Sequence, residues 1–293
     1  MSATAEAAAV RPATMQRARG LDGVLMFAIP LGVVALLCIG AGALPLPSPT
    51  AQDLENALIP PVWMEGGSAA HLLGTDHLGR DLLARILHGG KVTFLVAISA
   101  MLSSAILGTL VGLVSGFYRG WVDRIVSRLV EAQLALPFIL LAIGIISARG
   151  RSLEVLVAVL ALIGWAQYAR VIRADTLSIR ERPFVLGLRC AGVPSWRILL
   201  QHLLPNVGGT VLVLATLQVG TAILAESALS FLGLGVVPPY ISWGAMLADG
   251  RAQLTKAWWI ALFPGLSISF VVLLVNLLGD ATRSWIDPRK KRY

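Results

Sequence analysis

The sequence predicts an all-α integral membrane protein with six transmembrane helices. Its mean hydropathy is +0.77, and 56% of its residues are hydrophobic against only 14% charged. Soluble domains carry closer to ~25% charged residues. The charges also gather in short islands between apolar runs of about 20 residues, the length that a helix needs to cross the hydrocarbon core of a bilayer.

The first apolar run, Gly23–Pro47, contains 25 residues without a charge and follows Arg11, Arg17 and Arg19. It is too long for the core of a cleaved signal peptide. We therefore expect it to be the first transmembrane helix, with its basic flank on the inner side.

Further charge-poor runs predict five more spans, which lie at about 92–118, 129–148, 153–171, 203–225 and 257–279. The chain then divides into an inner N-terminal tail, the first span, an outer loop, a transmembrane domain and a basic inner tail. These parts cover residues 1–22, 23–47, 48–91, 92–280 and 281–293, and an inner loop, 172–202, lies within the transmembrane domain.

A charge-free segment, Ser227–Ala248, resembles a seventh span in composition only. It contains the pair Pro238-Pro239 and three glycines. The prolines break helical hydrogen bonds that lipid cannot replace. We expect an irregular or re-entrant segment that lies against protein.

The distribution of charge supports six spans with both termini inside. Four segments on the inner side then hold 17 of the 24 Lys and Arg residues; they are 1–22, 119–131, 170–202 and 280–293. This is the bias of the positive-inside rule, and a seventh span would place the basic C-terminal tail outside. The excess of basic residues is thus explained by membrane topology. Nucleic-acid binding would instead require basic residues interleaved with exposed aromatic ones, and the sequence does not show that pattern.

The sequence offers no catalytic grouping and no phosphate-binding loop, since Gly89-Gly90-Lys91 lacks the required upstream glycine. The two cysteines, Cys38 and Cys190, lie in unlike surroundings, which favours packing roles over a disulfide. A proton-coupled carrier is one alternative, because Glu131 and Glu226 lie near span ends. A membrane-embedded enzyme is another.

Three histidines in the outer loop raise the question of a metal site. They are His71, His77 and His88, and they accompany Asp76 and Asp81. No two of them have the close spacing that a metal site favours. We therefore expect no metal site.

The segment Arg170–Asn206 is the most informative part of the chain. It is basic and lies between two spans, and Gly192 predicts a turn that ends one helix before another begins. We expect Ser195 to cap the second helix. A merely solvated basic loop would explain the arginines but not this helix–turn–helix pattern.

This arrangement resembles the EAA loop of permease subunits in binding-protein-dependent ABC importers. In that family the short helix before the glycine is a coupling helix, which docks in a cleft of the ATP-binding subunit. Gly192 matches the family's glycine and Arg189 its basic residue, and Leu203-Leu204-Pro205-Asn206 matches its closing pattern. The sequence departs from the family at Leu186-Gly187-Leu188, where Glu-Ala-Ala would fall. The resemblance implies coupling residues Leu186, Gly187, Arg189, Ala191, Gly192 and Ser195.

Motifs in the rest of the chain resemble the C-type subunit of the dipeptide/oligopeptide/nickel class. They are Leu73-Gly74-Thr75-Asp76-His77-Leu78-Gly79-Arg80-Asp81, Trp165-x-x-Tyr168-Ala169-Arg170-x-x-Arg173, Glu226–Gly235 with Ser242-Trp243-Gly244, Asn276–Asp280, and Asp287-Pro288-Arg289. Their separation and order identify the chain as a member of this class more firmly than any one motif.

Several motif residues also have purely structural interpretations. Thr75 and Asp76 suit the cap of a helix over His77–His88, while Arg80 and Asp81 suit local salt bridges. Gly79 completes this outer motif. Tyr168 and Arg170 suit the membrane interface as well as a transport path. Glu226 suits a helix-end partner as well as a gate or path residue.

The resemblance implies a type I ABC importer permease (MetI-like) fold in the bacterial inner membrane. The partners it implies are a B-type permease, two ABC ATP-binding subunits, a solute-binding protein and membrane lipid, without nucleic acid. This chain would bind no cofactor and catalyse no reaction, because ATP and Mg would bind to the partner subunits. Di- or oligopeptides are the expected cargo; nickel, a metal chelate and glutathione are the alternatives.

Overall fold

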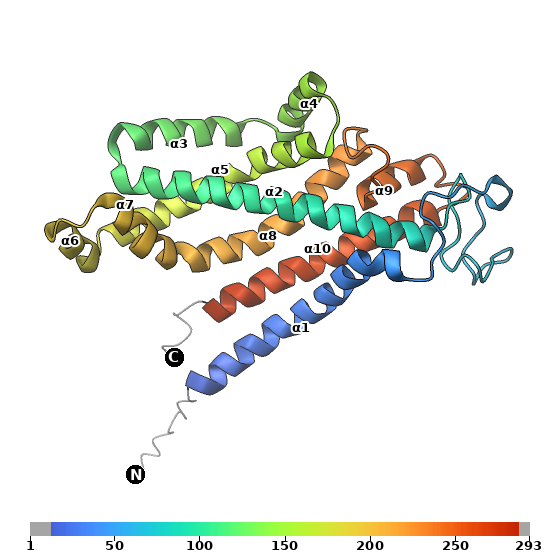
Figure 1. Cartoon of the computed structure of the whole chain (residues 1–293), viewed down its shortest axis with the longest axis horizontal. Coiled ribbons are helices and arrows are strands. Elements are labelled where there is room, and N and C mark those ends of the chain that lie inside the picture. The colour runs from blue at the N-terminus through green and yellow to red at the C-terminus, as the bar shows by residue number, and fades with distance from the viewer. Residues whose placement is uncertain (1–12, 287–293) are drawn as a thin grey trace, which may run out of the picture.

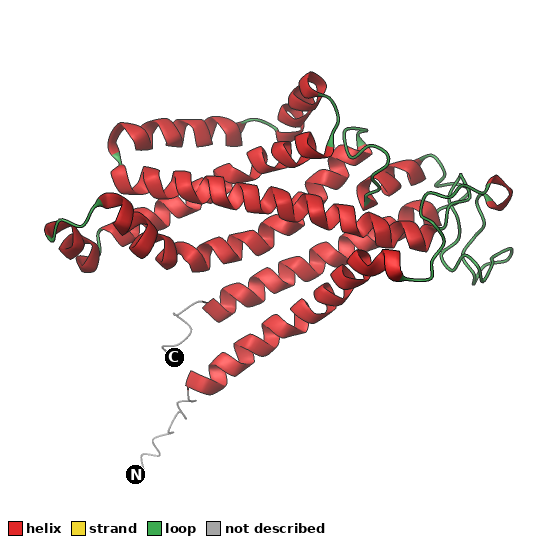
Figure 2. Ribbon diagram, viewed as in Figure 1, coloured by secondary structure: helices red, strands yellow, loops and turns green. Residues whose placement is uncertain are grey.

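The computed structural model describes residues 13–286, which form a bundle of helices (Figures 1 and 2). The helices are α1 Ala13–Ile39, α2 Leu82–Tyr118, α3 Gly120–Ala135, α4 Phe138–Arg149, α5 Leu153–Arg180, α6 Pro183–Cys190, α7 Ser195–Arg197, α8 Leu204–Phe231, α9 Trp243–Arg251 and α10 Trp259–Ile286. Two 3₁₀ turns, Gly40–Ala43 and Leu54–Asn56, and a π-helix, Ile198–Leu203, complete the regular structure.

Five helical segments of this range are long and apolar enough to cross a membrane. They are Leu21–Ala43, Leu82–Tyr118, Leu153–Arg180, Ser195–Phe231 and Trp259–Ile286. The pair α3–α4 makes a sixth if it counts as one span. The predicted fold class, an all-α membrane protein, is confirmed, while the side of the membrane on which the termini lie stays a prediction from charge.

Two helices begin about ten residues before the spans predicted within them, although the apolar part of α1 begins at Leu21, close to the predicted start. Helix α1 begins at Ala13, within the expected tail 1–22, and α2 begins at Leu82 instead of 92. Charge-free runs mark only the apolar part of a helix, and a helix continues through charged residues where they find partners. The outermost tail residues, 1–12 and 287–293 with the motif Asp287-Pro288-Arg289, lie outside the described range.

The predicted span 129–148 is not one straight helix. The helix bends by 93° between α3 and α4, at Leu136 and Pro137. Leu136 adopts an extended conformation there, as the residue before a proline prefers. Gln133 also ties the end of α3 to α5, since its Nε2 donates to the carbonyls of Leu162 and Ile163. The apolar run therefore supplies two helices with different directions.

The segment Ser227–Ala248 is only partly irregular. Its first five residues complete α8, and α9 begins at Trp243. The chain between them contains turns, with no long helix that could form a seventh span. The prolines at 238 and 239 fall in this stretch, where their missing N–H groups interrupt no helix.

The bundle has two distinct ends. Helices α6 and α7 lie at one end, toward which the first turn of α1 and the last turn of α10 also point (Figure 1). The irregular chain that precedes α2 lies at the opposite end. Because α5 extends to Arg180 and the π-helix begins at Ile198, we restrict the name inner loop to residues 181–197, and we call residues 73–81 the outer turn.

Helices α2 and α5 pack along a seam of small residues. Gly108, Gly112 and Gly116 recur every four residues on α2 and face α5. A Cβ atom at Gly112 would lie 2.8 Å from the carbonyl oxygen of Ala169, and one at Gly116 would lie 2.7 Å from Cβ of Thr176. Small residues at this spacing let two membrane helices approach closely. The pair therefore forms one tightly packed unit through most of the bundle.

Candidate functional site

The inner loop contains a short helix whose end is fixed by Gly192. Pro183 occupies the first turn of α6, where its missing N–H is harmless. After Cys190 the chain turns through Gly192, which has a φ of +73°. Gly192 N–H donates to the carbonyl of Arg189 and Val193 N–H to that of Leu188. This is a Schellman motif, which requires the left-handed conformation that glycine adopts most readily.

One face of α6 is held firmly against the bundle. Val185 is fully buried and packs in a cluster with Leu113 and Phe117 of α2 and Ile179 of α5. The guanidinium of Arg189 lies 4.6 Å from the centre of the Phe117 ring. Nη1 of Arg180 donates to the Phe117 carbonyl at 2.5 Å. We call Phe117, Arg180 and Arg189 the inner clamp.

The opposite face of α6 is exposed and apolar. Phe184 is 41% exposed and Leu186 45% exposed. A Cβ atom at Gly187 or Gly192 would meet nothing within 4 Å. Ala191 is exposed as well. The inner loop thus presents apolar surface on a frame that its other face holds in place.

Ser195 does not cap a helix. It is the first residue of α7, Pro194 occupies the capping position, and no side chain caps that helix. The following turns form the π-helix Ile198–Leu203, which leads into α8. Pro205 in the first turn of α8 cannot donate to the preceding turn, which accounts for the wider winding before it.

The outer turn starts α2, but not as the sequence indicated. Thr75 and Asp76 cap no helix over 77–88; the helix begins at Leu82, and Asp81 caps it by accepting a hydrogen bond from Ala84 N–H at 2.8 Å. Thr75 Oγ1 instead donates to the carbonyl of Asn56 and accepts from Ile59 N–H. Gly79, with a φ of +72°, leaves no room for a Cβ beside the backbone of Asp53.

Four charged side chains form a partly buried network beside the outer turn. Asp76 accepts from Arg80 Nε at 2.6 Å and lies 3.2 Å from Nη1 of Arg85. Arg85 also lies 3.5 Å from Asp249, which belongs to α9. We call these residues the outer network. It joins the outer turn, the start of α2 and the end of α9.

An Asp76→Asn variant is expected to unfold more readily. Removing one partner from a buried ion pair leaves the other charge uncompensated and costs about 3 kcal/mol. The thermal midpoint of the purified protein in detergent should therefore fall by several degrees. Glu65→Gln is the matched control, since Glu65 is exposed. Equal midpoints for the two variants would contradict the structural role of the network.

The outer-loop histidines have separate surroundings. Nδ1 of His71 lies 2.9 Å from Oδ2 of Asp81, and Nδ1 of His88 lies 2.9 Å from the carbonyl of Ala84. Within residues 13–286 no three His, Cys, Asp or Glu side chains come close enough to hold a metal ion.

The three residues expected near a gate or path lie in two different places. Tyr168 is 1% exposed and faces the seam with α2, and Glu226 is fully buried. The Glu226 carboxylate accepts from Ser230 at 2.6 Å and from Ser242 at 2.7 Å, so it joins α8 to the start of α9. Only Arg170 is exposed. A place on the path for Tyr168 and Glu226 stays a prediction.

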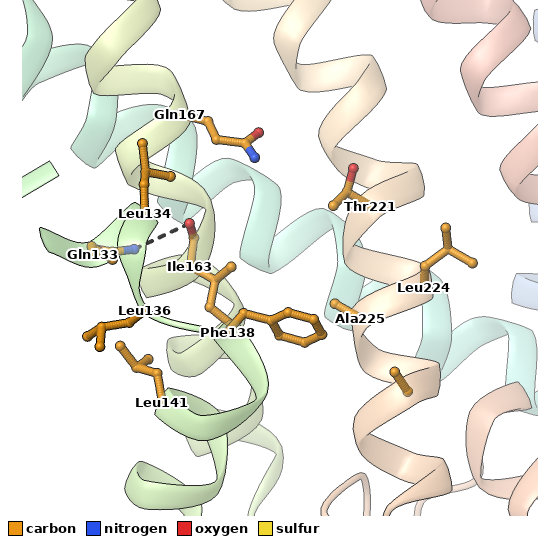
Figure 3. A pocket seen from close by; sticks show the side chains of 11 residues that line it. Gln133, Leu134, Leu136, Phe138, Leu141, Ile163, Gln167, Thr221, Leu224 and Ala225 are labelled. Carbon is orange, nitrogen blue, oxygen red and sulfur yellow. Dashed lines mark hydrogen bonds between the residues drawn. The ribbon is translucent and has the colours of Figure 1, made fainter. Parts of the chain in front are cut away.

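A groove opens between the α3–α4 bend, α5 and α8 (Figure 3). Its cavity has a volume of about 510 Å³, and its walls are mostly leucine, isoleucine, phenylalanine and alanine. Gln133 and Gln167 bring amide groups to it, and Thr221 brings a hydroxyl. The Gln133 side chain is already hydrogen-bonded to α5. Its Nε2 donates to two carbonyls of that helix, and its Oε1 accepts from Nε1 of Trp165 at 2.5 Å. We call this cavity the central groove.

Three parts of this architecture were missed from the sequence. The α2–α5 seam has a visible signal, the spacing of Ser104, Gly108, Gly112 and Gly116. The central groove has a weaker one, since Gln167 is a lone amide within an apolar span. The contact between Arg85 and Asp249 has no signal in the sequence, because the two residues are 164 positions apart.

A bundle of long apolar helices, with exposed apolar side chains on α6 at one end and a groove between its helices, is that of a multi-pass integral membrane protein. The family comparison is specific. Residues 108–292 match the model of the binding-protein-dependent transport system inner membrane component, and the chain belongs to that family. It is therefore a multi-pass permease of the bacterial inner membrane.

Individual relatives cover most of the chain. It is 42% identical over 243 residues to the di/tripeptide transport system permease protein DppC of Pseudomonas aeruginosa, covering 83% of this chain and 80% of the relative. It is 41% identical to the dipeptide transport system permease protein DppC of Alkalihalophilus pseudofirmus, covering 78% and 75%. It is 39% identical to the glutathione transport system permease protein GsiD of Pectobacterium atrosepticum, covering 82% and 79%.

Proposed function

We propose that this chain is the C-type permease subunit of an ATP-driven importer of di- and oligopeptides. The family membership supports the transport role, and the relatives named for di- and tripeptides support the cargo. In this proposal the chain forms half of the path with a B-type permease. A solute-binding protein delivers cargo at the outer end, and two ATP-binding subunits bind at the inner end.

The observation that carries the proposal is the two-faced character of α6. Its buried face, with Val185 and Arg189, fixes the helix to α2 and α5. Its exposed face presents Phe184 and Leu186 at the end of the bundle. Contiguous exposed apolar side chains mark a protein-binding surface. The partner proposed for this face is an ATP-binding subunit, which would receive α6 in a cleft and would bind ATP and Mg elsewhere on its own chain.

Force then reaches the path through the inner clamp. When the ATP-binding subunits close, α6 moves, and Phe117 carries the displacement into α2. Because α2 and α5 pack without a gap at the seam, they move together. The central groove lies beside α5 and opens or closes with that motion. This chain supplies movement and a wall of the path, and no bond is made or broken on it.

Glutathione is the second candidate cargo, because a relative with similar coverage is named for it. Glutathione is itself a tripeptide with free carboxylates, so the same path would suit both. A self-powered carrier has less support. Two hydroxyl hydrogen bonds to Oε1 hold the buried Glu226 in place, although its Oε2 has no partner within the described residues, and the exposed Glu131 pairs with Arg128 at 3.2 Å.

A Leu186→Asp variant tests the docking role of α6. Leu186 is exposed, so the change should leave the fold intact while placing a charge in an apolar interface. We expect the ATP-binding subunits to stop co-purifying with the permease, and ATP-driven uptake of labelled dialanine to fall by at least about tenfold.

Trp121→Asp is the matched control, since Trp121 is 68% exposed at the same end of the bundle but lies on α3. Co-purification and uptake should persist in that variant. Full assembly and uptake by Leu186→Asp would refute the docking role.

A further inference from the structure

Two exposed polar side chains interrupt the apolar surface of α5. Gln167 and Arg170 are both exposed and lie three residues apart, on one face of the helix. Arg170 lies in the second half of α5, and an arginine that faces lipid within a span costs free energy, up to about 2.5–3.5 kcal/mol at the centre of the span. Polar groups within spans therefore face the interior of a bundle or a water-filled cavity. This face of α5 is accordingly turned toward water or protein.

Gln167 lies at the central groove. In Figure 3 its amide and the Thr221 hydroxyl occupy opposite walls, on α5 and α8. Within the described part of the chain the Gln167 side chain makes no hydrogen bond, whereas Thr221 donates to the Leu217 carbonyl. Gln167 thus offers one donor group and one acceptor group within an apolar cavity. A peptide bond has the complementary pair.

Arg170 lies at a second cavity, which borders the central groove at Leu134. This cavity has a volume of about 450 Å³. Arg173, on the same wall, is paired with Asp123, since Nη2 lies 2.7 Å from Oδ2. Across residues 13–286, no carboxylate comes within salt-bridge distance of Arg170. Arg170 is thus a cation without a salt-bridge partner beside a mostly apolar cavity, whose one carboxylate, Glu131, pairs with Arg128.

We propose that the two cavities form a continuous peptide-binding segment of the transport path, in which Gln167 binds a backbone amide and Arg170 the C-terminal carboxylate. The inference rests on the proposed function and adds the residues that recognise the cargo. Hydrogen bonding to the backbone and to the terminal charge suits every short peptide. The apolar walls accept varied side chains without selecting among them.

Water access to the groove is the first test. In the assembled transporter, with Cys38→Ala and Cys190→Ser as background, single cysteines are placed at Gln167, Arg170 and Leu273. Leu273 is 55% exposed on α10. A charged methanethiosulfonate is excluded from lipid, so Gln167→Cys and Arg170→Cys should react at least about tenfold faster than Leu273→Cys. Rates equal to that of Leu273→Cys, with and without ATP, would overturn the proposal, because lipid or the second permease would then cover the groove.

Uptake of labelled dialanine is the second test. Arg170→Gln should lower uptake by about tenfold, because a hydrogen bond between two charged groups is lost, while ATP hydrolysis stimulated by the loaded binding protein persists. Arg170→Lys keeps the charge and should recover part of the uptake. Gln167→Leu should lower uptake as well. Loss of stimulated ATP hydrolysis in these variants would indicate a structural role and would overturn the proposal.

Failure of peptide import and failure of peptide binding in the groove give different results. If the unmodified transporter does not import dialanine, the proposed function is wrong. If it does, and Arg170→Gln and Gln167→Leu import dialanine at the same rate, only the peptide-binding role of the groove is refuted.

Discussion

A Gly112→Leu variant is expected to yield almost no folded protein. The carbonyl oxygen of Ala169 and Cβ of Ile172 lie 2.8 Å and 3.0 Å from the position of a Cβ at residue 112. Backbone cannot yield as a flexible side chain does, so α2 and α5 must separate. Overpacking typically costs about 1–3 kcal/mol, and a whole isobutyl group at this seam should exceed the upper figure.

The matched comparison uses alanine at two glycines of the same helix. Gly112→Ala should lower the thermal midpoint in detergent. Gly89→Ala should not, because the nearest atoms to a Cβ there lie at 3.5 Å, an ordinary contact distance. Folding of the Gly112→Leu variant is assessed by its yield of monodisperse protein in size-exclusion chromatography. Equal yields for Gly112→Leu and the unmodified chain would show that the seam is not close-packed.

A Phe117→Leu variant is expected to separate ATP hydrolysis from transport. Leucine keeps residue 117 apolar within its cluster but removes the aromatic ring beneath Arg189. Such a contact contributes about 0.5–2 kcal/mol, so the position of α6 relative to α2 becomes less fixed. The number of peptides imported per ATP hydrolysed should fall several-fold, because closure of the ATP-binding subunits then moves α6 without moving α2.

The control for this prediction is Phe117→Tyr, which keeps the ring and should keep coupling. Both variants are compared at equal amounts of assembled transporter, with uptake and ATP hydrolysis measured on the same proteoliposomes. A constant ratio of uptake to hydrolysis in Phe117→Leu would exclude the inner clamp as the route of force.

The sequence predicted which segments form membrane helices better than it predicted where those helices begin and bend. Charge-free stretches mark apolar helix surface, which is why the long helices were found and why the starts of α1 and α2 were misplaced. Leu136-Pro137 was present in the sequence, but hydropathy averages over such a pair and cannot show a bend. The apolar run continues through the bend, so it was interpreted as one span.

The short helix of the inner loop and its turn at Gly192 were predicted correctly because their signals are local, whereas the predicted cap at Ser195 was wrong. A glycine that follows a short helix by two residues depends on contacts within six residues of chain. The outer turn shows the opposite case, because Thr75 bonds to residues 56 and 59, and Asp76 belongs to a network that includes Asp249. Contacts over such separations are set by tertiary packing, so local capping rules chose the wrong helix start.

The construction of α6 has a consequence for how such transporters diversify. Its position depends on residues that face inward, Val185 and Arg189, and on the turn at Gly192. The residues that face outward, Phe184, Leu186 and Gly187, make none of the contacts that hold the helix. If α6 docks on an ATP-binding subunit as proposed, mutation of these outward-facing residues can alter which subunit is recruited without a stability cost to the bundle. The choice of partner would then evolve separately from the choice of cargo.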